Sequence, residues 1–299
     1  MSRRMIQLGV LVEPLINQLR AKILERPVVH SDETPIQVLK EAGKSVGSKS
    51  YMWVMARGAR GEKAVVFNYD ASRSQRVPKA LFAGYRGYLQ SDGYAGYNIL
   101  EGEGGIIRVG CWAHARRKFV DALKCAPRGG EGTVASAAVK MIKKLYEIER
   151  GIGEAPTEER FLVRQKISKP ILDEMRRWLD KNIAEVLPKS LTGKALGYLN
   201  NEWENLARYI DSGDLSIDNN LAERAIKPFA VGRKNWLFSD TPAGAAASAA
   251  LYSLIESAKA NKVEPYAYLK HVFTEIPKST SAAEIAALLP WEFKKLSQL

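Results

Sequence analysis

Three acidic residues stand where a carboxylate could do chemistry: Asp32 in HSDETP, Asp92 in QSDGYAGY and Glu223 in DNNLAERAI. The first two lie in apolar segments with the composition of β-strands, and the third lies in a helical pattern. Hard cations such as Mg²⁺ prefer oxygen ligands, so these carboxylates together could hold two divalent ions. Two such ions can clamp the attacking and leaving oxygens of a phosphoryl transfer. The pattern therefore predicts an enzyme that cuts nucleic acid.

Each of the two aspartates also has a purely structural interpretation. Asp32 stands close to Pro35 and could be a turn residue, whereas a buried carboxylate in a strand needs a metal, a cation or hydrogen-bond donors. Asp92 precedes Gly93, and Asp-Gly is a common hairpin signal. Taken alone, each aspartate favours the structural role. Taken together in a basic chain, they favour a metal site.

Glu223 has the strongest local pattern. Asn219 and Asn220 precede it by four and three residues and Lys227 follows by four, so all four share one face of a helix. The same pattern predicts Asp218 as the N-cap of this helix. It also predicts an apolar face made by Leu221, Ala225 and Phe229. The polar stripe could be a solvated surface, but the paired asparagines and the basic run that follows favour a functional face.

Cys111 and His114 form a C-x-x-H pair at the end of a predicted strand. Both side chains can bind a soft metal, but one such pair makes a closed zinc site within this chain improbable. A structural role near the active site is the better interpretation of both residues, with His114 hydrogen-bonded there.

Basic residues follow both the C-x-x-H pair and Glu223. Such side chains contact phosphates, and an aromatic ring can stack on a base. The DNA-binding residues expected on this ground are Arg116, Arg117, Lys118, Lys227, Arg233, Lys234 and Trp236. An alternative fits equally well, in which the basic residues form an ordinary surface cluster and Trp236 lies in the core.

Composition narrows the possible functions. The chain has 299 residues, 46% of them hydrophobic, and a formal charge of +12, which suits a polyanionic partner. Two cysteines are too few for a disulfide scaffold and fit a reducing cytosol. The start of the chain predicts one amphipathic helix, with apolar residues at Leu8, Val12, Leu15, Leu19 and Ile23. The chain contains no uninterrupted apolar run long enough to span a bilayer.

The order of predicted elements is that of an α/β protein. Strands are expected at 28–39, broken by Pro35, and at 51–56, 63–69, 87–92 and 106–113. A turn is expected at 58–61, and short helices at 76–83 and near 94–101. This order indicates a mixed sheet with helices packed on it.

From residue 114 the pattern becomes helical, with Gly129–Gly130, Gly151–Gly153 and Ser212–Gly213 as connectors. Roughly a hundred residues of all-helical sequence lie between Asp92 and Glu223, which is too long for an ordinary connection, so we predict an inserted all-α subdomain. The expected divisions are an N-terminal helix at 1–27, a first core part at 28–125, the insertion at 126–215, a second core part at 216–275 and a helical tail at 276–299.

These residues together resemble the transposases of the insertion sequence 66 family, a group of bacterial DDE enzymes. The resembling motifs follow the family order over about residues 28–270: HSDETPIQVL, YMWVMARG, FNYDASRS, GYLQSDGYAGYN, GCWAHARRKF, IDNNLAERAIKPFAVGRKNWLF and SLIESAKANKVEPYAYL. Long motifs in a fixed order are far more specific than a single triad of carboxylates.

The resemblance implies a ribonuclease-H-like catalytic core with an all-α region inserted before the catalytic Glu. Asp32, Asp92 and Glu223 fall on the family's metal-binding carboxylates, for two ions of Mg²⁺ or Mn²⁺. It implies double-stranded DNA as substrate, both element ends and target, with a homo-oligomer on the DNA, possible accessory proteins of the same element and a cytoplasmic location. Full family members carry an N-terminal DNA-recognition module, so the chain is expected to be a truncated copy.

Two other functions remain open at this point. A catalytically idle DNA-binding remnant would compete with or regulate an intact transposase, and the missing module favours it while the intact triad opposes it. A structure-selective nuclease on the same fold is the other alternative.

Overall fold

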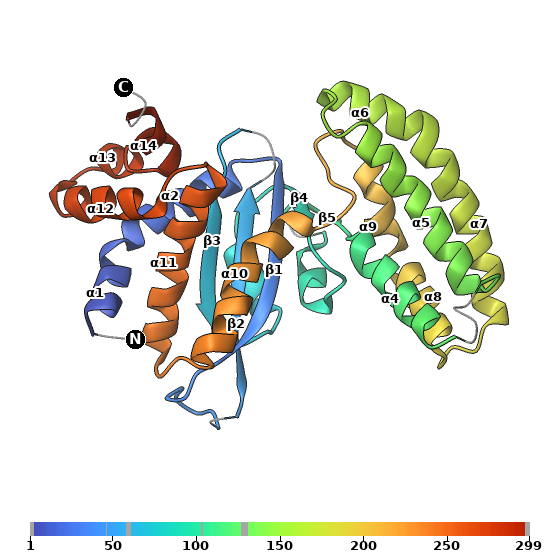
Figure 1. Ribbon diagram of the computed structural model, residues 1–299, viewed down its shortest axis with the longest axis horizontal. Helices are drawn as coiled ribbons and strands as arrows, with labels where there is room; N and C mark the ends of the chain where they lie inside the picture. Colours follow the sequence, from blue (N-terminus) through green and yellow to red (C-terminus); the bar gives the residue numbers. More distant parts are fainter. Residues whose placement is uncertain (1–2, 46, 58–60, 103, 127–130, 297–299) are drawn as a thin grey trace. The chain divides into compact units, whose positions relative to one another are not determined.

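The computed structural model describes residues 3–45, 47–57, 61–102, 104–126 and 131–296 (Figure 1). The chain forms two compact units. The sheet unit comprises residues 1–89, 95–107 and 220–299, and the helical unit comprises residues 90–94 and 108–219. The predicted turn at 58–61 and the connector at 129–130 lie largely or wholly outside the described residues.

Within the described residues, the sheet has five strands in the order β3-β2-β1-β4-β5. These are β1 (Val28–Gln37), β2 (Lys49–Arg57), β3 (Val65–Asp70), β4 (Gly87–Gln90) and β5 (Ile106–Val109). β1 pairs antiparallel with β2, and β2 pairs antiparallel with β3. The short elements α3 (Arg76–Leu81) and η1 (Ala95–Leu100) stand where helices are predicted. The predicted α/β fold class with a mixed, ribonuclease-H-like sheet is thus confirmed.

The predicted break at Pro35 is wrong. β1 continues through Pro35, which is paired with Tyr51 in register, while Asp32 is paired with Val54. The proline side chain is exposed. A strand tolerates proline at a position where the ladder does not need its N–H, so the residue interrupts neither the strand nor its alternation.

The predicted single N-terminal helix is instead two helices, α1 (Arg3–Leu11) and α2 (Glu13–Leu24), with Val12 between them. Pro14 lies in the first turn of α2, where its missing N–H costs nothing. Within one continuous helix the same proline would clash with the carbonyl of Val10. In α1, Gly9 lies against Ala247 so closely that an added Cβ would come within 2.7 Å of that residue.

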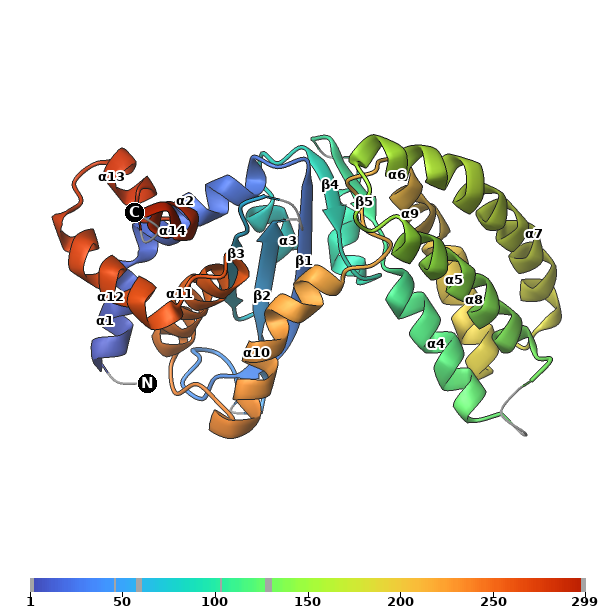
Figure 2. The ribbon, with the colours of Figure 1, turned by 45° about the horizontal axis from the view of Figure 1, so that its top comes forward.

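Two long helices, α10 (Asn220–Trp236) and α11 (Pro242–Ala260), pack on the sheet beside one another (Figures 1 and 2). Their apolar side chains form one core with those of the first three strands. The buried members of that core are Ile36, Val38, Met52, Val54, Ala56, Val65, Phe67, Ala222, Ile226, Phe229, Ala245 and Ala249.

The edge strand β3 is closed by side chains of α11 and the residue after it. Ser257 Oγ accepts from the N–H of Val65 at 2.9 Å and Ser253 Oγ accepts from the N–H of Phe67 at 2.8 Å. Asn261 continues the series by bonding the backbone of Lys63. The spacing fits because four helical residues and two strand residues both advance by roughly 6–7 Å. The motif SLIESAKAN thus protects a strand edge.

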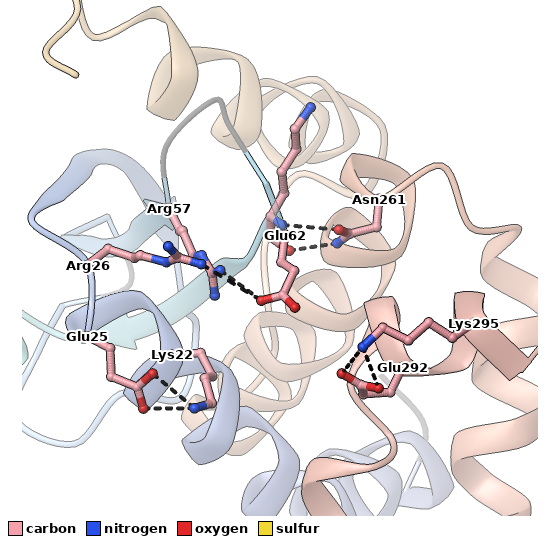
Figure 3. Close-up of polar contacts among 9 residues, drawn as sticks. Lys22, Glu25, Arg26, Arg57, Glu62, Asn261, Glu292 and Lys295 are labelled. Atoms are coloured by element: carbon pink, nitrogen blue, oxygen red, sulfur yellow. Dashed lines mark hydrogen bonds and ion pairs between the residues drawn. The ribbon is translucent and has the colours of Figure 1, made fainter. Parts of the chain in front are cut away.

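The C-terminal elements are α12 (Pro265–Glu275), α13 (Ala282–Ala286) and α14 (Pro290–Leu296). At the end of β2, the guanidinium of Arg57 donates to Glu62 at 3.0 Å and stacks on the ring of Trp291 in α14, 5.3 Å from its centroid. Figure 3 shows this buried arginine among the ion pairs Lys22–Glu25 and Glu292–Lys295. The contact joins the C-terminal helices to the sheet.

The helical unit contains α4 (Trp112–Lys124), α5 (Val134–Gly151), α6 (Thr157–Val163), α7 (Lys169–Glu185), α8 (Leu191–Asn201) and α9 (Trp203–Ala207). Short turns η3 (Arg164–Ser168) and η4 (Arg208–Ile210) complete it. No described helix in either unit is long and apolar enough to cross a membrane.

Arg164 is the polar centre of the helical unit. Its side chain is fully buried, and it donates to both carboxylate oxygens of Glu149, at 2.8 and 2.6 Å. It also donates to the carbonyls of Tyr209, Ser212 and Leu215. A buried charge is tolerated when it is paired and its donors are used, as in this unit. One side chain thereby fixes the chain that leads from η4 toward α10.

We expect Ser257→Ala to lower the free energy of unfolding by about 1–3 kcal/mol, because the N–H of Val65 loses its acceptor. Urea denaturation followed by circular dichroism measures this. Ser248→Ala is the matched control: Ser248 is buried in the same helix, but its hydroxyl bonds the Gly244 carbonyl of that helix. Equal losses in both variants would show that edge closure contributes nothing specific.

Candidate active site

The two acidic neighbours Asp32 and Glu33 lie on opposite faces of β1, because side chains alternate along a strand. Thr34 and Ile36 share the face of Asp32. Thr34 Oγ1 accepts from Arg233 of α10 at 3.1 Å, and Ile36 belongs to the core under α10. Asp32 therefore lies on the face of the sheet that α10 covers. It is half-buried, and its Oδ1 accepts from the N–H of Glu33 at 2.8 Å.

Glu33 is committed to the other face. Its buried carboxylate accepts from the hydroxyl of Tyr97 at 3.0 Å and from Arg73 at 2.8 Å. The hydroxyl of Tyr97 also forms a hydrogen bond with the hydroxyl of Ser31 at 3.0 Å, and its ring meets that of Trp53 edge-on. This network uses Glu33 to hold η1 against the sheet. Of the two carboxylates, Asp32 is the one oriented toward α10.

Glu223 lies in the first turn of α10, where a negative charge is favourable because of the helix dipole. The helix is held on the sheet by Ala222, Ile226 and Phe229, which are fully or almost fully buried. Glu223, beside Ala222 in sequence, is half-buried. α10 thus brings one acidic side chain to the sheet unit on the face that carries Asp32.

The predicted apolar face of this helix is displaced by one residue. Leu221 and Ala225 are only partly buried at the margin of the core, whereas Phe229 is in its centre. The helix begins at Asn220, two residues after Asp218, the predicted N-cap. The carboxylate of Asp218 instead accepts from the hydroxyl of Tyr146 at 3.0 Å.

Asp92 follows β4 by two residues and belongs to the helical unit. Its Oδ1 accepts from the N–H of Tyr94 at 3.0 Å, which makes an Asx-turn rather than a hairpin. Gly93 is required there, since a Cβ would come within 2.8 Å of the ring of Tyr198. Burial raises the pKa of Tyr198, and the negative charges of Glu202 and Asp92 raise it further.

Two residues that sequence reasoning missed hold the Asp92 turn. The buried side chain of Arg108 donates to the carbonyl of Asp92 at 3.2 Å and lies 3.8 Å from the carboxylate of Glu202. Asn205 donates to Glu202 at 3.1 Å and accepts from Arg208 at 2.8 Å. The available signal was a charge at Arg108 inside an otherwise apolar predicted strand.

Cys111 and His114 lie at the start of α4 in the helical unit. The Sγ of Cys111 and a ring nitrogen of His114 are within 4.8 Å of one another. The buried Cys111 Sγ accepts from the backbone N–H of Asn219 at 3.2 Å, and the backbone N–H of Trp112 donates to the carbonyl of Ile217 at 3.1 Å. These bonds fix the residues just before α10. The supporting role of Cys111 and Asn219 in a catalytic site remains a prediction. Asn220 is the first residue of α10.

The predicted DNA-binding residues are divided between the units. Arg116, Arg117 and Lys118 are exposed on α4, where Lys118 lies over the ring of Tyr198 at 4.6 Å. Lys227 and Lys234 are exposed on α10, and Arg233 is half-exposed. Their role in DNA binding remains a prediction.

Trp236 packs on the core of the sheet unit, which is the structural alternative to a surface position. It packs against the core under α10, with its ring edge-on to Phe229 at 5.4 Å. This packing gives the aromatic residue after the basic pair a structural role, and base stacking by Trp236 remains a prediction.

Comparison with known proteins identifies the relatives of this chain. The model of the transposase IS66 family matches residues 1–247, and that of the IS66 C-terminal element matches residues 253–291. Three uncharacterised proteins of Sinorhizobium fredii (strain NBRC 101917 / NGR234) are similar over almost the whole chain. The protein y4jD is 35% identical over 95% of this chain and 57% of its own length. The protein y4hP is 32% identical over 95% of this chain and 54% of its own length. The protein y4qI is 30% identical over 98% of this chain and 56% of its own length.

We expect Asp32→Asn and Glu33→Gln to act differently although the residues are adjacent. Glu33→Gln weakens the bonds from Arg73 and Tyr97, so the free energy of unfolding should fall by about 1–3 kcal/mol. Asp32→Asn should change it by less than about 0.5 kcal/mol but remove stabilisation by Mg²⁺. Thermal unfolding with and without Mg²⁺ measures both effects. A reversed pattern would show that Glu33, not Asp32, is the metal-binding residue.

Proposed function

Because the chain belongs to the IS66 family of transposases, we propose that it is the catalytic region of a DDE transposase. In this function it cleaves DNA at the ends of a bacterial insertion sequence and joins the freed strand to target DNA. The chain spans about half the length of the relatives it matches. The activity of a full-length relative is therefore not assigned to this chain, and only the DNA cleavage and joining step is proposed for it.

One observation carries the proposal: Asp32 lies on the face of β1 that is covered by α10, and the first turn of α10 contains Glu223. Asp92 completes the triad in the proposal. It follows β4 by two residues, and β4 is the neighbour of β1 in the sheet. The position of Asp92 within the motif GYLQSDGYAGYN, which resembles that of the family, supports its inclusion in the triad.

The DDE family implies dependence on divalent metal in general, and the donor set fits it. Asp32, Asp92 and Glu223 offer carboxylate oxygens, the ligands of Mg²⁺ and Mn²⁺, and all three are half-buried. We propose that they hold two ions. When bound, two such ions lower the pKa of an attacking water and stabilise the leaving 3′ oxygen.

The chain's own residues would supply the remaining requirements. Glu33, Arg108 and the Cys111–Asn219 contact hold the backbone that carries the carboxylates, so their positions change little during the reaction. Arg116, Arg117, Lys118, Lys227, Arg233 and Lys234 would contact the phosphates of double-stranded DNA, both element end and target. The proposal includes action in the cytoplasm, as a homo-oligomer on DNA, with accessory proteins of the same element as possible further partners.

The catalytic proposal predicts that Asp32→Asn, Asp92→Asn and Glu223→Gln each reduce cleavage of supercoiled or pre-nicked element-end DNA by at least about 100-fold. The reason is that each change removes a negative oxygen ligand of a metal. Cleavage is measured on gels with Mg²⁺ or Mn²⁺, and Ca²⁺ should support binding without cleavage.

Asp173→Asn serves as the control, because Asp173 is an exposed carboxylate paired with Lys169 on α7. DNA affinity of the Glu223→Gln variant should equal or exceed that of the wild type, as one negative charge near phosphate is lost. If the wild-type chain binds DNA but never cleaves it with any of these ions, the idle remnant is the correct function.

DNA binding should depend steeply on salt. The expected slope of log affinity against log salt is about −0.9 for each phosphate contact in duplex DNA. Arg116→Ala/Arg117→Ala should make this slope shallower by about one to two units and weaken all sequences alike. Fluorescence anisotropy at several salt concentrations measures it.

Lys140→Ala/Lys143→Ala is the matched control, since both lysines are exposed on α5 of the same unit. A loss confined to one DNA sequence would show that Arg116 and Arg117 read bases. An unchanged slope would place the DNA path away from α4.

A further inference from the structure

The two residues that follow α10 are large, apolar and directed to the surface. Leu237 is 63% exposed and Phe238 is 44% exposed, whereas Trp236 beside them packs on the core. Isolated exposed apolar residues are ordinary on protein surfaces. Two in succession at the end of a basic helix, in a chain of charge +12, are less ordinary and suggest a binding role.

The backbone holds this pair in a fixed and costly conformation. Leu237 has φ 62°, in the left-handed region that glycine adopts easily and a bulky residue rarely does. Its N–H donates to the carbonyl of Arg233 at 2.8 Å, and the N–H of Phe238 donates to Trp236 at 2.7 Å. Strain of this kind persists where the surroundings enforce it, and it is a reason to ask what the side chain does.

The chain after the pair is fastened as firmly as the chain before it. Ser239 forms a parallel bridge with Val38, donates its N–H to Gln37 at 2.9 Å and accepts from Leu39 at 3.0 Å. The pair is therefore presented on a short turn between α10 and the extension of β1. Apolar side chains on such a turn keep their position when a partner binds, so little conformational entropy is lost on binding.

The charges around the pair select the kind of partner. Lys234 is exposed three residues before Leu237, and Arg233, at 3.1 Å from Thr34, precedes it by four. Lys227 is exposed farther up the same helix. Basic side chains beside two apolar ones fit a partner that has negative charges on both sides of an apolar surface. DNA is such a partner, because its stacked bases lie between two phosphate backbones. A second copy of this basic chain would bring like charges together instead.

We propose that Leu237 and Phe238 form an apolar wedge that inserts at a weakened base step of DNA held along α10. The proposal rests on the proposed function, because it takes DNA as the partner. Side chains of this kind enter between base pairs and unstack them, while neighbouring Arg and Lys contact the backbone. Leu237 lies fourteen residues after Glu223, or about 20 Å along a helix axis, which is the length of roughly six base pairs.

The test compares a fully paired duplex of about 30 base pairs with the same duplex carrying a central mismatch next to 2-aminopurine. Anisotropy gives affinity, and 2-aminopurine fluorescence reports unstacking. The wild-type chain should bind the mismatched duplex about tenfold more tightly and raise the fluorescence. Leu237→Ser/Phe238→Ser should lose both effects while its affinity for the paired duplex stays within about twofold.

Two further variants make the test specific. Val231→Ser removes an apolar side chain that is 51% exposed on the same helix, and it should leave the preference unchanged. Leu237→Gly fits the left-handed conformation without strain, so its melting temperature should equal or exceed that of the wild type while the mismatch preference falls. A variant that is more stable yet less selective cannot be explained by unfolding.

The results separate the wedge from the catalytic proposal. The wedge is wrong if the wild-type chain shows no preference for the mismatched duplex. It is also wrong if the preference survives the loss of both side chains. Either result holds even if carboxylate-dependent cleavage is found. A preference that depends on Leu237 and Phe238 in a chain that never cleaves DNA supports the wedge and overturns the catalytic proposal. If sedimentation shows a dimer that Leu237→Ser/Phe238→Ser dissociates, the pair contacts a second copy and the wedge is wrong.

Discussion

The packing of α10 on β1 and β2 is the contact on which the proposed site depends. Three buried residues, Ala222, Ile226 and Phe229, fix which side of the helix meets the sheet. That choice determines that Glu223 stays half-buried on the covered face, that Arg233 reaches Thr34, and that Trp236 enters the core. It also determines that the next two residues are directed outward. Rotation of the helix by one residue position, about 100°, would change all of these positions together.

The sheet that receives α10 is held by polar contacts at its margins as well as by its core. Serines 253 and 257 close the edge of β3, and Glu33 joins β1 to η1 on the opposite face. Arg57 joins β2 to the C-terminal helix through Trp291. Each of these groups lies outside the proposed catalytic set. The fold therefore uses separate polar residues for stability, and Asp32 and Glu223 need not be structural.

The sequence was sufficient for the order of elements because alternation in the strands and three-to-four spacing in the helices are strong and local. The resemblance predicts Asp32 rather than Glu33 as a metal ligand, and the structure shows that these two carboxylates lie on opposite faces of β1. The sequence was not sufficient for the face of α10. Residues 221, 225 and 229 and residues 222, 226 and 229 are both apolar series at helical spacing. Only the position of the sheet decides between them.

The same ambiguity affected the aromatic residues. Trp236 and Phe238 both follow the basic pair, and the exposed one depends on where the helix ends and how Leu237 turns the chain. Arg108 and Arg164 were missed for a related reason. A buried arginine is recognised by its partners. Glu202 lies in a different part of the sequence from Arg108, and Glu149 lies on a different helix from Arg164. Long-range pairing of this kind leaves almost no local signal.

The central claim is that Asp32, Asp92 and Glu223 hold divalent ions together. Anomalous scattering from crystals of the chain grown with Mn²⁺ tests it most directly. We expect two manganese positions about 4 Å apart, each within coordination distance of carboxylates of this triad. Manganese bound elsewhere, or a triad whose three carboxylates do not converge on shared ions in the crystal, would contradict it.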